Sequence, residues 1–254
     1  MAGEPSRDVL SAARDVARNA VLALDTATPR VSVAIARGAR VLATREGAQR
    51  ESSALLIGWI DEALAEAGLA LGDLAGAVAA SGPGSFTGLR VGLATLLGFH
   101  QAIGLRVTGI PTLALLAAAA FSARRVAALV PAGPGEWFAQ VFGATWPPAP
   151  QGEPRRLPAA GLAAQLAGDG DAQRREAIDL LVVAAADEAA RLRDLPWPVH
   201  VAGSLAPVVA RLASEHPPTW DAATLRAPLY LAPPPVTVPG APKPVLPLGE
   251  GAVR

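Results

Sequence analysis

The glycine-rich segment at residues 81–92 is the part of the chain best suited to chemistry. It reads Ser-Gly-Pro-Gly-Ser-Phe-Thr-Gly-Leu-Arg-Val-Gly and separates a short apolar run from a longer stretch of helical character. Glycine-rich turns at the start of a helix expose backbone N–H groups and suit an anion. The segment could therefore hold a phosphate, with Gly82 and Gly84 as candidate binding residues. Equally, its glycines could form a tight crossover that lets the following helix pack against a sheet.

Two better-defined motifs do not fit this segment. In a P-loop the last glycine precedes lysine and a hydroxyl residue, whereas Gly88 precedes leucine and arginine. A nucleophile elbow has glycines two residues before and after its serine, and Pro83 and Thr87 occupy those positions around Ser85. The sequence thus predicts neither a P-loop nucleotide site nor acyl transfer by this serine.

A second candidate is the turn at residues 25–28, Asp-Thr-Ala-Thr, which follows the first apolar run. Asp25 could hold a metal ion and a phosphate, as an aspartate at this place does in actin-like ATPases, with Thr26 lining the turn. Alternatively, the aspartate and threonine side chains bond to their own backbone and simply form the turn. We favour the second interpretation, because a lone carboxylate is weak evidence for catalysis.

The sequence contains no metal-binding pattern. His100, His200 and His216 are far apart, and none has a second histidine or a carboxylate at a metal-binding helical spacing. The chain has no cysteine, which excludes disulfides, thiolate metal sites and thiol nucleophiles. A free-standing peptidase would need a metal site or a nucleophile, so this interpretation lacks its chemistry.

Charge and hydropathy limit the possible partners. The 22 basic residues balance the 22 acidic ones, whereas a protein that binds a nucleic-acid backbone alone usually carries excess positive charge. The first twenty residues lack the apolar core of a signal peptide. The longest uncharged run is shorter than the ~20 residues that a spanning helix needs. We expect a cytoplasmic protein without a membrane segment, whose contact with RNA is local or shared with a partner.

The elements that must position these candidates follow an α/β order. The first half predicts strands at 20–25, 31–35 and 41–44, a helix from a cap at Ser52 or Ser53 to Gly68, a strand at 74–80, a helix at 89–103 and a strand at 106–110. This is the order of an RNase H-like lobe. The second half predicts Pro111 in the first turn of a helix, strands at 125–130, 136–142 and 199–202, a proline-rich loop at 146–158, and helices at 159–167, 174–192 and 205–213.

The predicted organisation is therefore two α/β lobes with an appendage at each end. The extension covers residues 1–19, the N-terminal lobe residues 20–110, the C-terminal lobe residues 111–232, and the proline-rich tail residues 233–254.

The two helices of the first lobe carry more apolar residues than one buried stripe requires. Either they are enclosed within this chain, or they present a second face to another protein. We favour a partner interface, with these candidate residues: Leu55, Leu56, Trp59, Ile60, Leu93, Leu96, Leu97 and His100.

Three segments together resemble the bacterial TsaB family, also called YeaZ. They are Leu-Asp-Thr-Ala-Thr at 24–28, Arg50 with Ser53 ahead of the first helix, and the glycine-rich segment 82–92. The resemblance implies two RNase H-like lobes of the actin, Hsp70 and sugar-kinase (ASKHA) type, without a working nucleotide site. It also implies a role in making threonylcarbamoyladenosine (t6A) in tRNA.

The resemblance further implies which partners to expect. The two helices would pair with a TsaD-like catalytic subunit, and the assembly would recruit a TsaE-like ATPase. This chain would bind no cofactor itself, ATP and metal would belong to the partner subunits, and tRNA would be reached only through the complex. The same helices could also form a homodimer.

The second half departs from the family pattern. Residues 131–133 read Pro-Ala-Gly where the family often has Asp-Ala-Arg, and Ala232 replaces a common arginine. In the first half, Ser52 replaces a frequent histidine. These changes remove charged and hydrogen-bonding groups and leave the apolar positions in place, so we expect the fold to survive. Functions that depend on the lost groups should be weakened.

The alternative function is an active ATP-dependent phosphotransferase of the same fold. It would need acidic metal ligands in both lobes and a glycine-rich adenosine motif, for which the second lobe offers only residues 202–204.

Overall fold

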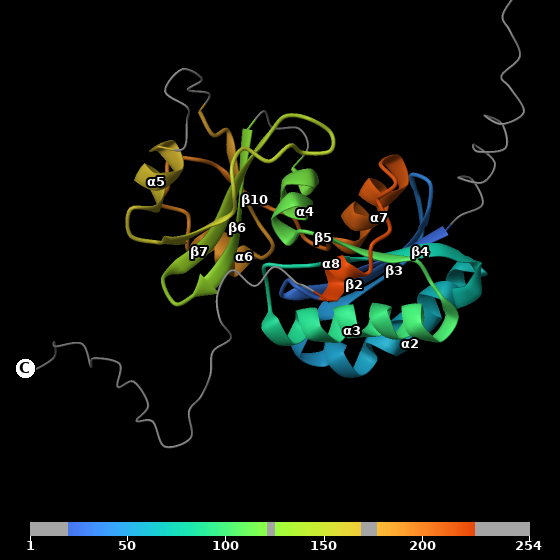
Figure 1. The fold of residues 1–254 in the computed structure, drawn as a ribbon. Coiled ribbons are helices and arrows are strands. Elements are labelled where there is room, and N and C mark those ends of the chain that lie inside the picture. The colour runs from blue at the N-terminus through green and yellow to red at the C-terminus, as the bar shows by residue number, and fades with distance from the viewer. Residues whose placement is uncertain (1–19, 121–124, 169–176, 227–254) are drawn as a thin grey trace, which may run out of the picture.

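The computed structural model describes residues 20–120, 125–168 and 177–226 as two lobes, each built on a five-stranded sheet (Figure 1). The strand order is β3-β2-β1-β4-β5 in the first sheet and β10-β9-β6-β7-β8 in the second. The predicted class, α/β with two RNase H-like lobes, is confirmed. The extension 1–19 and the tail 233–254, with Ala232, lie outside the described residues.

The first sheet contains both antiparallel and parallel strands. β1 pairs antiparallel with β2 and parallel with β4, whereas β3 and β5 form its two edges. All six residues of β1 are buried, as its continuous apolar run predicts. The strands are β1 (Ala20–Asp25), β2 (Arg30–Arg37), β3 (Arg40–Ala48), β4 (Leu74–Ala80) and β5 (Val107–Ile110), and each predicted strand of this lobe is confirmed.

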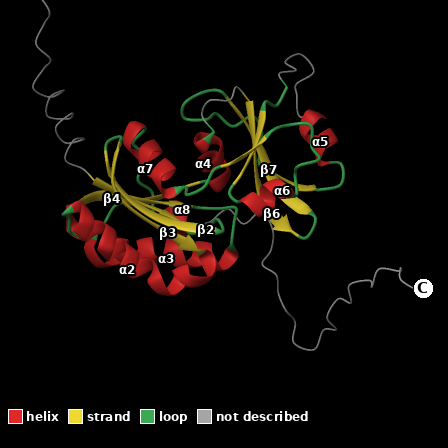
Figure 2. Ribbon diagram, turned by 180° about the vertical axis from the view of Figure 1, so that it is seen from behind, coloured by secondary structure: helices red, strands yellow, loops and turns green. Residues whose placement is uncertain are grey.

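Helices α2 (Gln49–Ala67) and α3 (Phe86–Ile103) lie side by side on one face of this sheet (Figures 1 and 2). α2 ends at Gly68, which adopts the left-handed conformation with φ 65°, as predicted. α3 begins three residues before its predicted start, and α2 begins four or five residues before its own. The cap of α2 is Ala48 and not a serine, and the side chains of residues 50–53 are not described. In α3, the hydroxyl of Ser85 accepts the N–H of Gly88 at 3.2 Å and so begins the helix early.

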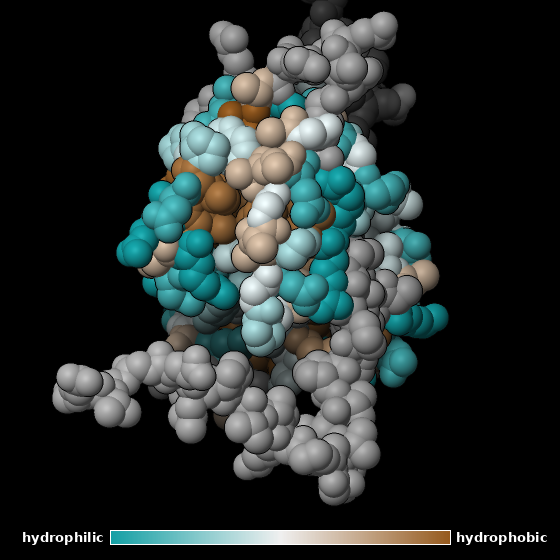
Figure 3. Space-filling model, turned by 90° about the vertical axis from the view of Figure 1, so that its left-hand side faces the viewer, coloured by the Kyte–Doolittle hydropathy of each residue, from teal (hydrophilic) through white to brown (hydrophobic). Residues whose placement is uncertain are grey.

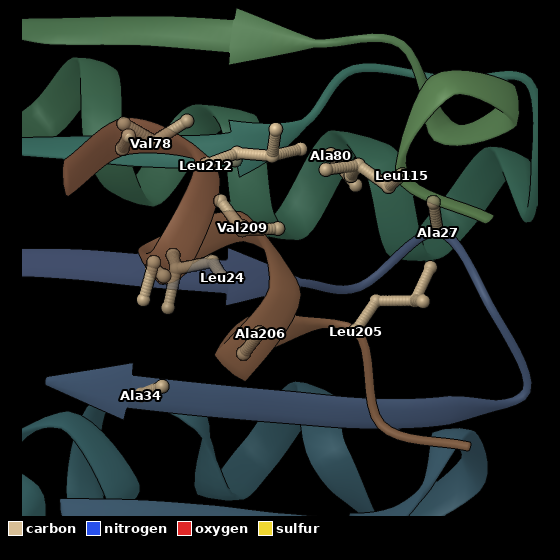
Figure 4. Close-up of a cluster of buried hydrophobic side chains, with 14 of the residues drawn as sticks. Leu24, Ala27, Ala34, Val78, Ala80, Leu115, Leu205, Ala206, Val209 and Leu212 are labelled. Atoms are coloured by element: carbon tan, nitrogen blue, oxygen red, sulfur yellow. The ribbon is translucent and has the colours of Figure 1, made fainter. Parts of the chain in front are cut away.

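The opposite face of the first sheet is covered by a helix from the end of the chain, α7 (Ala206–Glu215). Figure 4 shows its residues Ala206, Val209 and Leu212 facing Leu24 and Val78 of the sheet. The short helix α8 (Ala223–Arg226) lies beside β5. The boundary predicted at residue 110 assigns these two helices to the second lobe, whereas they pack on the first sheet.

The second sheet has helices on both faces. Its strands are β6 (Arg125–Gly133), β7 (Glu136–Gly143), β8 (Arg155–Pro158), β9 (Leu180–Val183) and β10 (Val199–Val201). Alternate residues of β6 face opposite ways: Val126 and Ala128 join the core with α4 (Thr112–Ala119), whereas Ala127 and Leu129 join a separate core with α5 (Leu162–Gly168). A mixed surface, with hydrophobic areas among hydrophilic side chains, faces the viewer at this end of the molecule (Figure 3).

Three predictions for the second lobe need correction. The helix predicted at 174–192 is instead the buried strand β9 and the short helix α6 (Ala186–Ala190), because an apolar run of four residues fits a parallel strand beside β6. The loop predicted at 146–158 contains β8, which pairs with β7. Pro111 caps α4 and is not in its first turn. The predicted strands that became β6, β7 and β10 are confirmed.

Candidate functional site

The carboxyl group of Asp25 is hydrogen-bonded within its own turn. One oxygen accepts the backbone N–H groups of Ala27 at 2.9 Å and Thr28 at 3.3 Å, and the other accepts the Thr28 hydroxyl at 2.5 Å. The side chain has no exposed surface. Three hydrogen bonds from Ala27 and Thr28 to this buried carboxyl group support the turn interpretation over a metal or phosphate ligand.

Burial also changes the acidity of this group. Desolvation raises the pKa of Asp25 from 3.8 to about 6, and outweighs the opposing effect of the hydrogen bonds from Thr28 and Ala27. Near neutral pH the turn therefore contains a buried carboxylate, and the groups that donate hydrogen bonds to it are all uncharged. Its position is sustained by the three donors of the turn.

The glycine-rich segment packs directly against this turn. The N–H of Ser85 donates to the carbonyl oxygen of Ala27 at 2.8 Å. A β-carbon added at Gly84 would lie 2.4 Å from that same oxygen. Gly82 has a φ of 102°, which only glycine adopts easily, and its carbonyl oxygen accepts the N–H of Thr112 at 2.8 Å. The loop is thus held on both sides by backbone contacts.

The first turns of α3 are equally close to Thr26. A β-carbon at Gly88 would lie 1.9 Å from the Thr26 carbonyl oxygen, and one at Gly92 would lie 2.2 Å from the Thr26 hydroxyl oxygen. Between the loop and the turn there is thus no space for a phosphate. The predicted candidates Asp25, Thr26, Gly82 and Gly84 are brought together, but as a packed junction of β1 and α3. This arrangement supports the tight-crossover interpretation of the glycines.

A cleft of about 340 Å³ lies between the lobes. Its two charged residues, Arg30 and Glu46, neutralise one another in an ion pair at 2.7 Å. The Ser204 hydroxyl also donates a hydrogen bond to Glu46. Residues 184–186 and Gly203 form the opposite wall. Among the described residues, no group of three or more His, Cys, Asp or Glu side chains could hold a metal ion.

Four of the eight predicted interface residues must be corrected. Their side chains face this chain's own core and cannot contribute area to a partner, with exposed fractions of 1% for Leu56, 1% for Ile60, 3% for Leu93 and 0% for Leu96. For Leu56 and Ile60 the signal for this was present in the sequence, whereas α3 carries apolar residues all round and does not reveal its buried side. Residues that recur three and four positions apart occupy one side of a helix, and Leu56 and Ile60 belong to such a stripe.

The other four predicted residues remain at least partly accessible. Leu55 is 45% exposed, whereas Trp59, Leu97 and His100 are half-buried. Trp59 covers β3, where a β-carbon on Gly47 would lie 2.6 Å from its ring. The Nδ1 of His100 donates to the carbonyl oxygen of Leu105 at 2.9 Å, so this ring helps to close the end of α3.

The exposed sides of α2 and α3 carry several small and apolar residues. Ile57, which the sequence analysis missed, is 50% exposed. Gly58 and Gly98 are exposed, and a β-carbon on either would meet nothing within 4 Å. We call the following set the α2–α3 surface: Leu55, Ile57, Gly58, Ala94, Leu97 and Gly98. Exposed apolar residues on adjacent helices are typical of a protein interface.

No helix in the described part of the chain is both long and apolar enough to cross a membrane.

The chain is similar to proteins and structures of one group. Residues 43–149 match the model of the TsaD family, tRNA N6-adenosine threonylcarbamoyltransferase. The chain is 38% identical over 125 residues to the tRNA threonylcarbamoyladenosine biosynthesis protein TsaB of Haemophilus influenzae, covering 48% of this chain and 53% of that protein. It is 34% identical over 121 residues to TsaB of Escherichia coli, covering 46% and 52%. The chain thus matches about half the length of these relatives.

The structural similarity extends further along the chain. YeaZ from Pseudomonas aeruginosa superposes with a TM-score of 0.62 and 25% sequence identity, over 78% of this chain and 91% of that one. The sequence matches are therefore confined to about half of the chain, whereas the fold is shared over most of it.

Proposed function

Because the chain belongs to the TsaB (YeaZ) family, we propose that it is a non-catalytic subunit which supports a TsaD-like enzyme in making t6A in tRNA. The observation that carries the non-catalytic part is the packing of Gly84, Gly88 and Gly92 against residues 26–27. This packing leaves no space for a phosphate between the glycine-rich loop and the turn. Asp25, the carboxylate nearest to it, is engaged by its own turn.

The α2–α3 surface is the proposed contact with the TsaD-like subunit. Gly58 and Gly98 let a partner helix approach closely, and Leu55 and Ile57 supply exposed apolar area beside them. Both helices lie within the stretch that matches the TsaD family model. A partner of that family would therefore have comparable helices, and a homodimer through the same surface is the competing assembly.

The remaining partners are part of the same proposal. A TsaE-like ATPase would join the complex of the two subunits, and ATP and metal would bind in the partner subunits. This chain, with equal numbers of basic and acidic residues, would reach tRNA only within that complex. Its proposed location is the cytoplasm.

The decisive experiment is reconstitution with the TsaD homologue from the same source. The chain should co-purify with that homologue, and t6A formation should require both. Gly98→Arg should abolish co-purification, because it places a long charged side chain on the α2–α3 surface while leaving the fold intact. Ala164→Arg, at an exposed position of α5 in the other lobe, is the matched control and should change nothing. Full t6A synthesis without this chain would disprove the proposal.

The interlobe cleft is the observation in favour of the alternative, an ATP-dependent phosphotransferase. Its volume of about 340 Å³ could admit a ligand. A titration of the isolated chain with Mg-ATP separates the two functions. The subunit proposal expects no turnover, whereas micromolar binding accompanied by hydrolysis or phosphate transfer would favour the enzyme.

A further inference from the structure

The last turn of α7 makes a polar contact with the second lobe. Trp146 lies just after β7, and its indole N–H donates to a carboxylate oxygen of Glu215 at 2.6 Å. Most of α7 packs on the first sheet, so this bond joins a residue next to the second sheet with a helix of the first lobe. The acceptor is charged, which makes such a bond stronger than one between neutral groups.

Two further side chains surround the indole ring. The guanidinium carbon of Arg211 lies 4.5 Å from the ring centroid, and its Nε donates to the second oxygen of Glu215 at 3.0 Å. The His216 ring meets Trp146 edge-on, with centroids 6.3 Å apart. The bond from Arg211, followed by that from Trp146, holds the pKa of Glu215 below its ordinary value. Glu215 is thus a carboxylate at neutral pH, with each oxygen hydrogen-bonded.

The loop that carries Trp146 is closed at its base. The N–H of Gly143 donates to the carbonyl oxygen of Ala149 at 2.9 Å, and the N–H of Gln151 donates to that of Val141 at 2.7 Å. The Thr145 hydroxyl accepts the N–H of Ala149 at 3.0 Å. The ring is therefore presented by a loop that is tied to β7 and cannot follow α7 independently.

The lobes also share one hydrophobic core. Val126 and Val182 of the second sheet belong to the same buried cluster as Val209 of α7 and Leu24 of the first sheet. In this cluster α4 lies against both α7 and the second sheet. The Trp146 contact thus closes the outer end of an interface whose inner part is apolar.

We infer that the contact of Trp146 with Arg211 and Glu215 fixes the second lobe to α7, so that the two lobes move as one rigid body. Opening of the cleft between the lobes would require this contact to break. The inference goes beyond the proposed function and does not depend on it, because it concerns the isolated chain.

Spin labels can measure the distance between the lobes directly. The chain has no cysteine, so Gln101→Cys on α3 and Ala164→Cys on α5, both exposed positions, accept labels without a background. The parent protein should give one narrow distance distribution. Trp146→Ala should broaden it and add a longer distance, and amides near the loop should lose protection from hydrogen exchange by about tenfold.

Three further variants complete the test. Trp146→Phe keeps an aromatic ring for Arg211 but removes the N–H donor, and should broaden the distribution less. Trp197→Ala removes a tryptophan that packs against the second lobe's separate core, and should leave the distance unchanged. If Trp146→Ala fails to fold, Glu215→Ala removes the same hydrogen bond from the other side and should also broaden the distance distribution. A distribution that stays as narrow as the parent's in a folded Trp146→Ala or Glu215→Ala protein would overturn the inference.

Discussion

The carbonyl oxygen of Thr26 lies 1.9 Å from the place where a β-carbon on Gly88 would be. Two segments that the sequence presents as separate candidates are thus one packed junction, in which β1 ends directly on the first turn of α3. The backbone conformation of Gly88 is ordinary for a helix and would suit any residue. Glycine is needed at this position because a side chain would collide with the backbone of Thr26. A backbone oxygen cannot move aside as the end of a flexible side chain can.

Gly88→Ala should therefore destabilise the protein by about 3 kcal/mol, at the upper end of the cost of overpacking a core. The added methyl group must displace either the turn at residues 25–28 or the start of α3. Urea unfolding followed by circular dichroism measures the free energy of unfolding.

Gly58→Ala is the matched control for this prediction. Gly58 also lies within a helix, but its added β-carbon meets nothing within 4 Å. Alanine favours an exposed helix over glycine by about 1 kcal/mol, so this variant should be slightly more stable than the parent. Equal stability of the two variants would contradict the close packing at Gly88.

Asp25 should make the stability of the protein depend on pH in an unusual direction. The folded protein keeps the proton up to about pH 6, whereas the unfolded chain releases it near 3.8. The stabilising contribution of this group is therefore present below 3.8 and is lost as the pH rises through 6. A shift of two pKa units corresponds to about 3 kcal/mol.

Asp25→Asn tests this sign. The amide oxygen can still accept the N–H groups of Ala27 and Thr28, and the side chain stays neutral at every pH. We expect the variant to be more stable than the parent at pH 8, and this advantage to shrink at pH 4.5. Urea unfolding of the parent and the variant at pH 8 and at pH 4.5 gives the difference in unfolding free energy between the two proteins. The contributions of all other titrating groups cancel in this difference. An advantage that is the same at both values would contradict the raised pKa.

The first sheet could be predicted from local signals, because its strands are short apolar or alternating segments bounded by turn residues. The end of α2 could be predicted as well, since Gly68 supplies the left-handed conformation that stops a helix. The start of α2 could not. Its cap is Ala48, which has no side-chain hydrogen bond to reveal the boundary.

The missing parts depend on contacts between distant residues. α7 packs on β1 and β2, which lie near the other end of the described sequence. Nothing within residues 206–215 indicates that this helix packs on those strands. The side of α3 that faces the core was missed for a different reason. Apolar residues occur on every side of this helix, so the sequence does not show that the side with Leu89, Leu93 and Leu96 is the buried one. At the candidate site, the identities of Asp25, Thr26 and the glycines were predicted, but the packing of the glycines against Thr26 and Ala27 was not.

Two adjacent leucines of α2 should respond in opposite ways to truncation. Leu56 is buried, and Leu56→Ala should cost about 2 to 5 kcal/mol in unfolding free energy. Leu55 is 45% exposed, and Leu55→Ala should change the unfolding free energy by less than about 0.5 kcal/mol. If the α2–α3 surface binds the TsaD-like subunit, Leu55→Ala should instead weaken that complex by about tenfold.

Urea unfolding and titration calorimetry with the purified partner separate these effects. Leu97→Ala, on the same surface of α3, should also weaken the complex, but it should cost more unfolding free energy than Leu55→Ala because Leu97 is half-buried and packs against the core. Unchanged affinity in both the Leu55 and the Leu97 variant would place the partner elsewhere, without affecting the assignment of Leu56 to the core.

Ser32 should be the residue on which the start of α7 depends. Its buried hydroxyl oxygen accepts the N–H of Ala206 at 3.1 Å, which ties the first turn of the helix to β2. Ser32→Ala leaves that N–H buried and unpaired, at a cost of about 1 to 3 kcal/mol. Ser204→Ala, which removes a hydroxyl bonded to the exposed Glu46, should cost less than about 0.5 kcal/mol. Urea unfolding ranks the two variants, and an equal or larger loss for Ser204→Ala would show that the buried bond does not anchor α7.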